Sequence, residues 1–179
     1  MSQESMSYSA RMKSAIERDI EAISLRPSVA RGQDRMTVVA GPDAVCTARD
    51  GHHNLKIDLG RSHGGEGTTP GPGFLVSAAL GACMAQACIN WAAYFDVPVN
   101  RVSVEMLADF DVTTALGLEG DASCAYTNVR LVIEIDSSAP PADIEHVVDT
   151  AASRDFMLAV FDEAHPVERE LRITNAAAA

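Results

Sequence analysis

The chain has 179 residues, and its 25 aspartates and glutamates outnumber its 14 lysines and arginines, which gives a formal net charge of −11. With 47% hydrophobic and 22% charged residues, the composition is that of one folded globular domain, and a disordered or fibrous chain is excluded. The negative charge repels a nucleic-acid backbone, so we do not expect nucleic acid as a partner. Polar residues interrupt the longest apolar stretch, so we expect no membrane partner either. The polar N-terminus lacks a secretion signal, so we expect a cytoplasmic protein.

The first third of the chain predicts one helix and three short strands. Apolar residues recur at helical spacing over Ser9–Leu25. Arg26-Pro27 ends this helix, because the residue before a proline disfavours the helical conformation. The three segments with the length and residue types of strands are Met36–Val39, Val45–Ala48 and Leu55–Leu59.

A glycine-proline segment, Gly60–Gly73, leads directly into the most apolar part of the chain. It contains six glycines and two prolines in 14 residues, which predicts a loop. The stretch that follows, up to Phe95, is rich in alanine and leucine and is apolar on nearly every side. We therefore expect a helix that is buried on all sides, either as the central helix of the fold or against a second subunit as well.

The second half of the chain predicts a pair of strands, a helix and a last strand. Apolar and polar residues alternate over Val102–Val112 and Val129–Ile135, and a polar connection joins these two strands as an antiparallel pair. A helix starts at Pro140 and carries apolar residues up to Ala151, and Val167–Ile173 alternates as a closing strand. The element order is that of an α+β fold in which helices back an antiparallel sheet.

Four cysteines, Cys46, Cys83, Cys88 and Cys124, are expected to be free thiols in a reducing compartment. Cys83 and Cys88 lie about 140° apart around a helix axis, so they cannot form a disulfide within one helix. Cys83 follows the glycine-proline loop on the apolar helix, which would place a nucleophile on a rigid element behind a mobile loop that admits substrate. A neighbouring arginine could lower its pKa from about 8.5. A thiol in such a helix is also typical of simple core packing.

The histidines do not form a recognisable metal motif. His63 and Glu66 lie in the glycine-proline loop and, with Cys83, could be imagined as a Cys/His pair or a metal site. No HxH, HxxH or CxxC spacing supports such a site, so we expect neither a metal nor a cofactor. The other histidines, which have the sequence context of surface residues, are His52, His53, His146 and His165.

The run GGEGTTPGPGFLVSAALGACM, Gly64–Met84, followed by an alanine-rich helix, VPV and a strand, resembles the OsmC/Ohr family of osmotically induced and organic-hydroperoxide-resistance proteins. The likeness extends over roughly Met36–Ile173. It implies an OsmC-like domain over residues 31–175, with antiparallel sheets packed on a central buried helix in an intertwined homodimer. Residues 1–30 would form an N-terminal helical extension similar to that of one branch of the family.

The resemblance also implies a site. In this family a cysteine thiolate attacks a hydroperoxide, an arginine and a glutamate organise the thiolate, and a second cysteine resolves the sulfenic acid as a disulfide. Cys83 matches the attacking cysteine, whereas the second cysteine falls on Asp155 and the glutamate falls on Gly73. Asp155 could replace the lost acidic group or could be a solvated residue at a helix end, and we favour the latter. Close to Cys83, its negative charge would oppose formation of the thiolate. The candidates for the arginine are Arg31, Arg35 and Arg61.

The sequence supports two functions of different classes. The first is a one-cysteine thiol peroxidase that reduces organic or lipid hydroperoxides with Cys83 and is regenerated by an external thiol reductant. It predicts a lowered pKa of Cys83 and an apolar pocket under Gly60–Gly73. The second is a non-catalytic homodimer that holds a small hydrophobic ligand, with Cys83 in the packing. A hydrolase using Cys83 or Asp155 is a third candidate, but no triad supports it.

Overall fold

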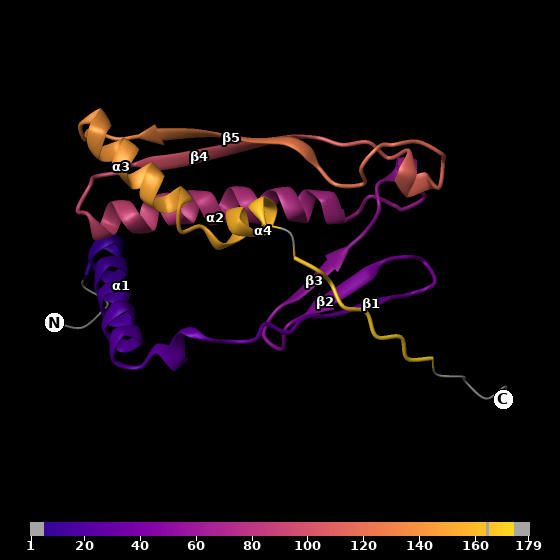
Figure 1. The fold of residues 1–179 in the computed structure, drawn as a ribbon, viewed down its shortest axis with the longest axis horizontal. Coiled ribbons are helices and arrows are strands. Elements are labelled where there is room, and N and C mark those ends of the chain that lie inside the picture. The colour runs from indigo at the N-terminus through magenta and orange to yellow at the C-terminus, as the bar shows by residue number, and fades with distance from the viewer. Residues whose placement is uncertain (1–5, 164, 174–179) are drawn as a thin grey trace.

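The computed structural model describes residues 6–163 and 165–173, which fold into four α-helices and two antiparallel sheets. The pair β4–β5 lies along one side of the long helix α2, and α3 and α4 pack against the same helix (Figure 1). Helix α1 crosses one end of α2, and an extended linker runs from α1 to the separate sheet β1–β3 (Figure 1). The α+β class and the antiparallel sheets expected from the sequence are confirmed.

Helix α1, Tyr8–Leu25, matches the expected N-terminal helix. Ser7 caps it, because its side chain accepts a hydrogen bond from the backbone N–H of Ala10 at 3.3 Å. The helix ends before Pro27, where a short 3-10 turn, Pro27–Ala30, follows. Lys13 forms an ion pair with Asp96, just beyond the end of α2, so α1 is tied to the main helix at that point.

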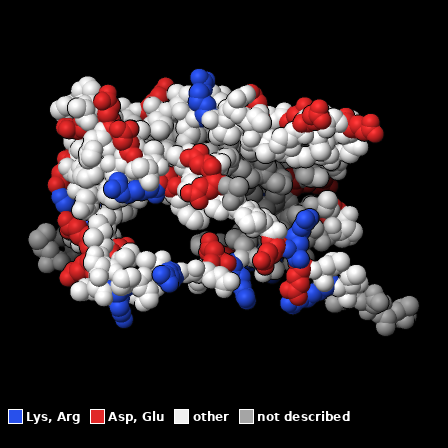
Figure 2. All heavy atoms as spheres, in the orientation of Figure 1, with Lys and Arg blue, Asp and Glu red and all other residues white. Residues whose placement is uncertain are grey.

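The first sheet consists of β1, Thr37–Ala40, β2, Cys46–Arg49, and β3, Asn54–Ile57, each within two residues of its predicted position. Its order is β1-β2-β3, with Val38 opposite Ala48. Every residue of β1 is exposed. Figure 2 shows an open gap between the linker that leads to this sheet and the body formed around α2. The sheet therefore receives little cover from its own chain.

Helix α2, Pro72–Tyr94, begins with a proline in its first turn, where the missing N–H costs nothing. The prediction that it is buried on all sides is wrong for the single chain, since Phe74 is 64% exposed and Val76 41%. Length and composition alone would let α2 cross a membrane, but core helices of soluble proteins share these properties, so α2 does not indicate a membrane protein. The buried residues of α2 are Leu80, Met84, Cys88, Ala92 and Ala93.

The core lies between α2, the second sheet and α3, Pro141–Ala152. Strands β4, Arg101–Asp109, and β5, Thr127–Asp136, pair antiparallel with Val104 opposite Ile133. Apolar residues on one face of this pair pack on α2 and α3, as the alternating pattern predicts. The buried centre of this cluster consists of Met84, Cys88, Ala92, Val147 and Ala151.

The C-terminal part of the chain departs from the prediction in two ways. A fourth helix, α4, Phe156–Asp162, follows α3 and packs on α2, although no helix was expected there. Val167–Ile173 forms no strand, and its apolar side chains are exposed, with Leu171 at 83%. A strand needs a hydrogen-bonding neighbour, and within the described part of this chain no segment pairs with these residues.

Candidate functional site

Cys83 lies in the middle of α2, half-buried, on the side that α4 covers. Burial raises the pKa of the Cys83 thiol above its ordinary value, because the charged form loses hydration. The backbone N–H groups of Met157 and Phe156 act in the opposite direction, whereas the nearby carboxylate of Asp155 raises the pKa further. The lowered pKa expected of an activated thiolate is therefore wrong for the single chain.

Asp155 is buried, with only 4% of its surface exposed, so its interpretation as a solvated residue is wrong. It is the N-cap of α4, and its Oδ1 accepts a hydrogen bond from the N–H of Leu158 at 2.7 Å. Its other carboxylate oxygen, Oδ2, forms no hydrogen bond within the described residues. The chain turns sharply from α3 into α4 at this point, which carries Asp155 inward beside Cys83.

The candidate arginines lie away from the thiol in the single chain. Arg61 donates from Nε to the carbonyl oxygen of Glu66 at 3.1 Å, within the glycine-proline loop. Arg31 and Arg35 are exposed in the linker before β1. Across residues 6–163 and 165–173, no arginine forms a hydrogen bond with Cys83. The assignment of an activating arginine stays a prediction.

An apolar cavity of about 560 Å³ opens near Cys83, between the first turns of α2, the end of the loop before β5, and α4. Ala79, one helical turn before Cys83, contributes to its wall, and Met157 contributes both to this wall and to the surroundings of the thiol. The expected apolar pocket is thus present, but its lining does not come from Gly60–Gly73. The other lining residues are Leu75, Val76, Ala125, Tyr126, Val160 and Phe161.

Tyr126 lies close to Gly73, the position on which the resemblance places the family's glutamate. A Cβ atom at Gly73 would lie 3.3 Å from the Tyr126 hydroxyl, which is closer than most such contacts. The hydroxyl therefore occupies the space into which a side chain at position 73 would begin to extend. Tyr126 is also the cavity residue whose side chain carries a hydrogen-bonding group, so its hydroxyl is the polar group of this otherwise apolar cavity.

The glycine-proline loop is held in place by Asp58, a residue that the sequence analysis did not single out. Asp58 is 3% exposed, and its carboxylate accepts hydrogen bonds from the N–H groups of Leu59 at 2.7 Å and Thr68 at 3.3 Å. Burial raises the pKa of Asp58, but these backbone donors outweigh burial and the net pKa is lowered. A Cβ atom at Gly65 would lie 2.0 Å from the Leu59 carbonyl oxygen, so the loop requires glycine there.

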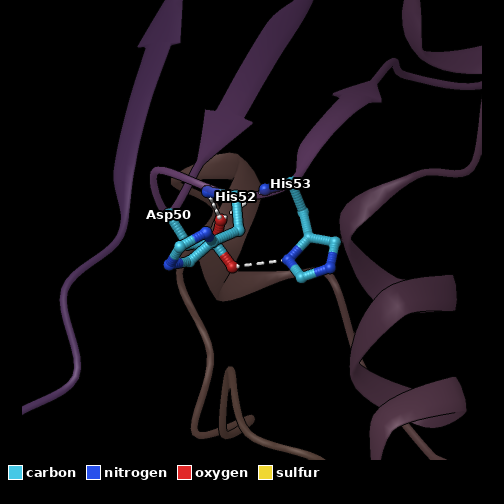
Figure 3. Close-up of polar contacts among 3 residues, drawn as sticks. All are labelled: Asp50, His52 and His53. Atoms are coloured by element: carbon cyan, nitrogen blue, oxygen red, sulfur yellow. Dashed lines mark hydrogen bonds and ion pairs between the residues drawn. The ribbon is translucent and has the colours of Figure 1, made fainter.

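The histidine pair forms a separate surface turn (Figure 3). Asp50 Oδ1 accepts hydrogen bonds from the backbone N–H groups of His52 at 2.7 Å and His53 at 2.6 Å, and its Oδ2 lies 2.9 Å from His53 Nδ1. These contacts lower the pKa of Asp50, with the His53 side chain as the largest cause. Gly51 has a φ of 98°, which suits the tight turn from β2 to β3. Both histidines are exposed, as their turn context predicts.

The fold and the site define an α+β protein with a thiol on a long apolar helix beside an apolar cavity. The family model for OsmC-like proteins matches residues 64–170, more than half of the chain. The chain therefore belongs to the OsmC-like protein family. A comparison with curated proteins finds no match.

Solved structures share the fold at low sequence identity. An OsmC-like protein from Mycoplasma pneumoniae is 17% identical with a TM-score of 0.63, and the match covers 73% of this chain and 88% of that one. The organic hydroperoxide resistance protein OsmC from Legionella pneumophila is 18% identical with a TM-score of 0.55, over 73% and 89% of the two chains. An OsmC-like protein of unknown function from Vibrio cholerae is 13% identical with a TM-score of 0.56, over 73% and 94%.

Proposed function

We propose that this protein is a cytoplasmic one-cysteine thiol peroxidase that reduces organic hydroperoxides, with Cys83 as the attacking group. One observation carries the proposal: Cys83 lies one helical turn from a wall residue of the apolar cavity of about 560 Å³, and Met157 belongs to the surroundings of both. A cavity of this size suits a small organic molecule. Membership of a family in which the Legionella pneumophila relative is named an organic hydroperoxide resistance protein supports the same activity.

The proposed reaction begins when the Cys83 sulfur attacks the distal oxygen of the hydroperoxide. Cys83–SH and ROOH give Cys83–SOH and ROH, so the sulfur is oxidised as the O–O bond breaks. One molecule of an external thiol then forms a mixed disulfide with loss of water, and a second molecule releases Cys83–SH and a low-molecular-weight disulfide. Cys88 does not resolve the sulfenic acid, because it lies fully buried on another side of α2.

The cavity selects the proposed substrate. Its lining is apolar except for the Tyr126 hydroxyl, so it favours a hydrophobic hydroperoxide whose single polar end can be hydrogen bonded. Hydrogen peroxide gains nothing from the apolar wall, and we therefore expect it to be the poorer substrate.

The proposed working form is a homodimer. The exposed apolar residues of β1 and of the first turn of α2 need a cover that their own chain does not give. In the proposed dimer the second chain completes the site by placing Arg35 or Arg61 beside Cys83, since neither arginine forms a hydrogen bond with the thiol within one chain. An arginine beside the thiol would offset the effects of burial and of Asp155 on its pKa.

A second candidate function is the non-catalytic binding of a small hydrophobic molecule in the same cavity. The raised pKa of Cys83 favours this candidate, since a protonated thiol is a poor nucleophile. In this case Cys83 is a packing residue, and the apolar cavity is the whole functional site.

Trapping of the sulfenic acid tests the two functions against each other. Reduced protein is treated with one equivalent of cumene hydroperoxide or hydrogen peroxide in the presence of dimedone, and the modified cysteine is identified by mass spectrometry. We expect rapid labelling of Cys83, faster with cumene hydroperoxide, and no such labelling in Cys83→Ser. Cys124→Ser, which removes an exposed thiol, is the matched control and should label like the wild type. Labelling of Cys83 at the rate of a free thiol contradicts the peroxidase and favours the binding protein.

A further inference from the structure

The buried carboxylate of Asp155 has a free oxygen in the interior of the molecule. One oxygen, Oδ1, caps α4 by accepting the Leu158 N–H at 2.7 Å, while Oδ2 has no hydrogen-bond partner within the described residues. The residue is 4% exposed, and this oxygen is itself buried. Buried polar atoms almost always have a partner, because an unpaired one is costly. Capping of α4 therefore accounts for only one of the two oxygens of this carboxylate.

Two thiols of α2 lie near the Asp155 carboxylate. Cys83 comes from α2, which packs directly on α4, and the charge of Asp155 acts on the thiols of both Cys83 and Cys88. Cys88 is fully buried in the core and closed to substrate, whereas Cys83 is half-buried and adjoins the cavity through Met157. The neighbouring Arg154 holds its guanidinium over the ring of Trp91, 5.0 Å from the ring centroid. The thiol of Cys83 is thus the reactive group beside the carboxylate.

We propose that Asp155 is a catalytic residue that transfers the thiol proton of Cys83 to the departing alkoxide during the reduction of an organic hydroperoxide. This inference rests on the proposed function and assigns a second reacting group to the same site. The carboxylate accepts the S–H proton as the sulfur bonds to the distal oxygen, and the resulting carboxylic acid gives that proton to the RO⁻ group as the O–O bond breaks. The products are Cys83–SOH and ROH, and Asp155 ends the step as a carboxylate.

This step resolves an apparent conflict in the site. A buried thiol beside a negative charge is protonated at neutral pH, so attack through a preformed thiolate is slow. Removal of the proton during the attack requires no preformed thiolate, and general-base assistance of this kind typically contributes about 10²- to 10⁴-fold to a rate. The same contact that disfavours the free thiolate therefore supplies the base.

Asp155→Asn tests the proposal, because asparagine keeps the helix cap but cannot carry the proton. We expect the second-order rate constant for cumene hydroperoxide, followed as sulfenic acid formation at Cys83, to fall about 100-fold at pH 7. The variant's rate should then rise about tenfold per pH unit toward alkaline pH, because only the thiolate reacts, whereas the wild type should depend much less on pH. Asp162→Asn, at the exposed C-terminal end of α4, is the control and should behave like the wild type.

The opposite result overturns the proposal. If Asp155 acted only through its charge, asparagine would lower the pKa of Cys83, and the reaction at pH 7 would become faster or stay unchanged. Asp155→Ser, which also caps a helix without carrying a proton, repeats the test should the asparagine variant fail to fold. A wild-type rate no greater than that of a free thiol would instead contradict the proposed function itself, so the two failures are distinguishable.

Discussion

Cys83 and Cys88 lie five positions apart on α2 in different chemical surroundings. Burial and, to a lesser degree, the charge of Asp155 raise the pKa of Cys88 to about 11. Cys83 lies half-buried on the side that α4 covers, and backbone N–H groups of α4 partly oppose the effect of burial on its pKa. The helix thus carries one fully buried thiol and one half-buried thiol near the cavity.

This difference predicts the order in which the thiols react with iodoacetamide. At pH 8 a thiol of pKa about 11 is about one part in a thousand thiolate, and Cys88 is also closed to reagent, so we expect its native alkylation to be more than about 100-fold slower than that of the exposed Cys124. A timed pulse followed by mass spectrometry measures this ratio. In guanidinium chloride the two rates should become similar, and fast labelling of Cys88 in the native protein would contradict the buried position.

Asp58 links the end of β3 to the glycine-proline loop that precedes α2. Its folded-state pKa is lowered, so its unfolded-state value of about 3.9 is the higher of the two. The stability that Asp58 contributes is therefore present above pH 4 and is lost as the pH falls through the folded-state pKa. The loop should loosen in acid before the core is affected, because its backbone N–H groups depend on this one carboxylate.

Asp58→Asn should lower the melting temperature at pH 7, because the amide cannot accept hydrogen bonds with both of its terminal atoms. The difference from the wild type should shrink as the pH falls below about 4 toward the lowered folded-state pKa, because the wild-type carboxylate becomes protonated there. Thermal unfolding followed by circular dichroism measures both curves. Asp34→Asn, in the exposed linker before β1, should follow the wild type at every pH. A difference that stays constant with pH would contradict the role of the charge.

Most elements could be predicted from the sequence because their periodicity is local. The helix over Ser9–Leu25 and the alternating strand of Val129–Ile135 were found within a few residues of α1 and β5. Helix α4 was missed because it spans only Phe156–Asp162, too short for a periodic pattern to stand out. Val167–Ile173 alternates like a strand, but alternation does not supply the neighbour that a strand requires.

The candidate site was predictable only in part. The position of Cys83 on an apolar helix after a glycine-rich loop could be predicted, since both patterns are local. Its surroundings could not, because Asp155 reaches it through a turn some 70 residues later in the chain, and Tyr126 approaches Gly73 from the loop before β5. Burial raises the pKa of the thiol, whereas the sequence predicted a lowered pKa. Burial depends on packing between segments that are distant in the sequence.

The whole molecule carries more exposed apolar surface than a stable single chain normally shows. Val38 is 54% exposed and Val39 63% exposed, and they lie on opposite faces of β1. Both faces of this edge strand therefore lack cover from the rest of the chain. A second copy packed on this sheet would bury these residues, as in the homodimer that we propose.

We therefore expect the protein to have twice the 19.0 kDa mass of one chain in light scattering coupled to size-exclusion chromatography. Val39→Glu places a carboxylate where the second chain would cover β1, and an unpaired charge in a dry interface is strongly destabilising. This variant should shift the protein toward monomer, or should lower its melting temperature and make that temperature depend more steeply on protein concentration. Val39→Ile keeps the apolar surface and should remain dimeric. A wild-type protein that is monomeric and stable at micromolar concentration would contradict the homodimer, and the site would then consist of the residues of one chain.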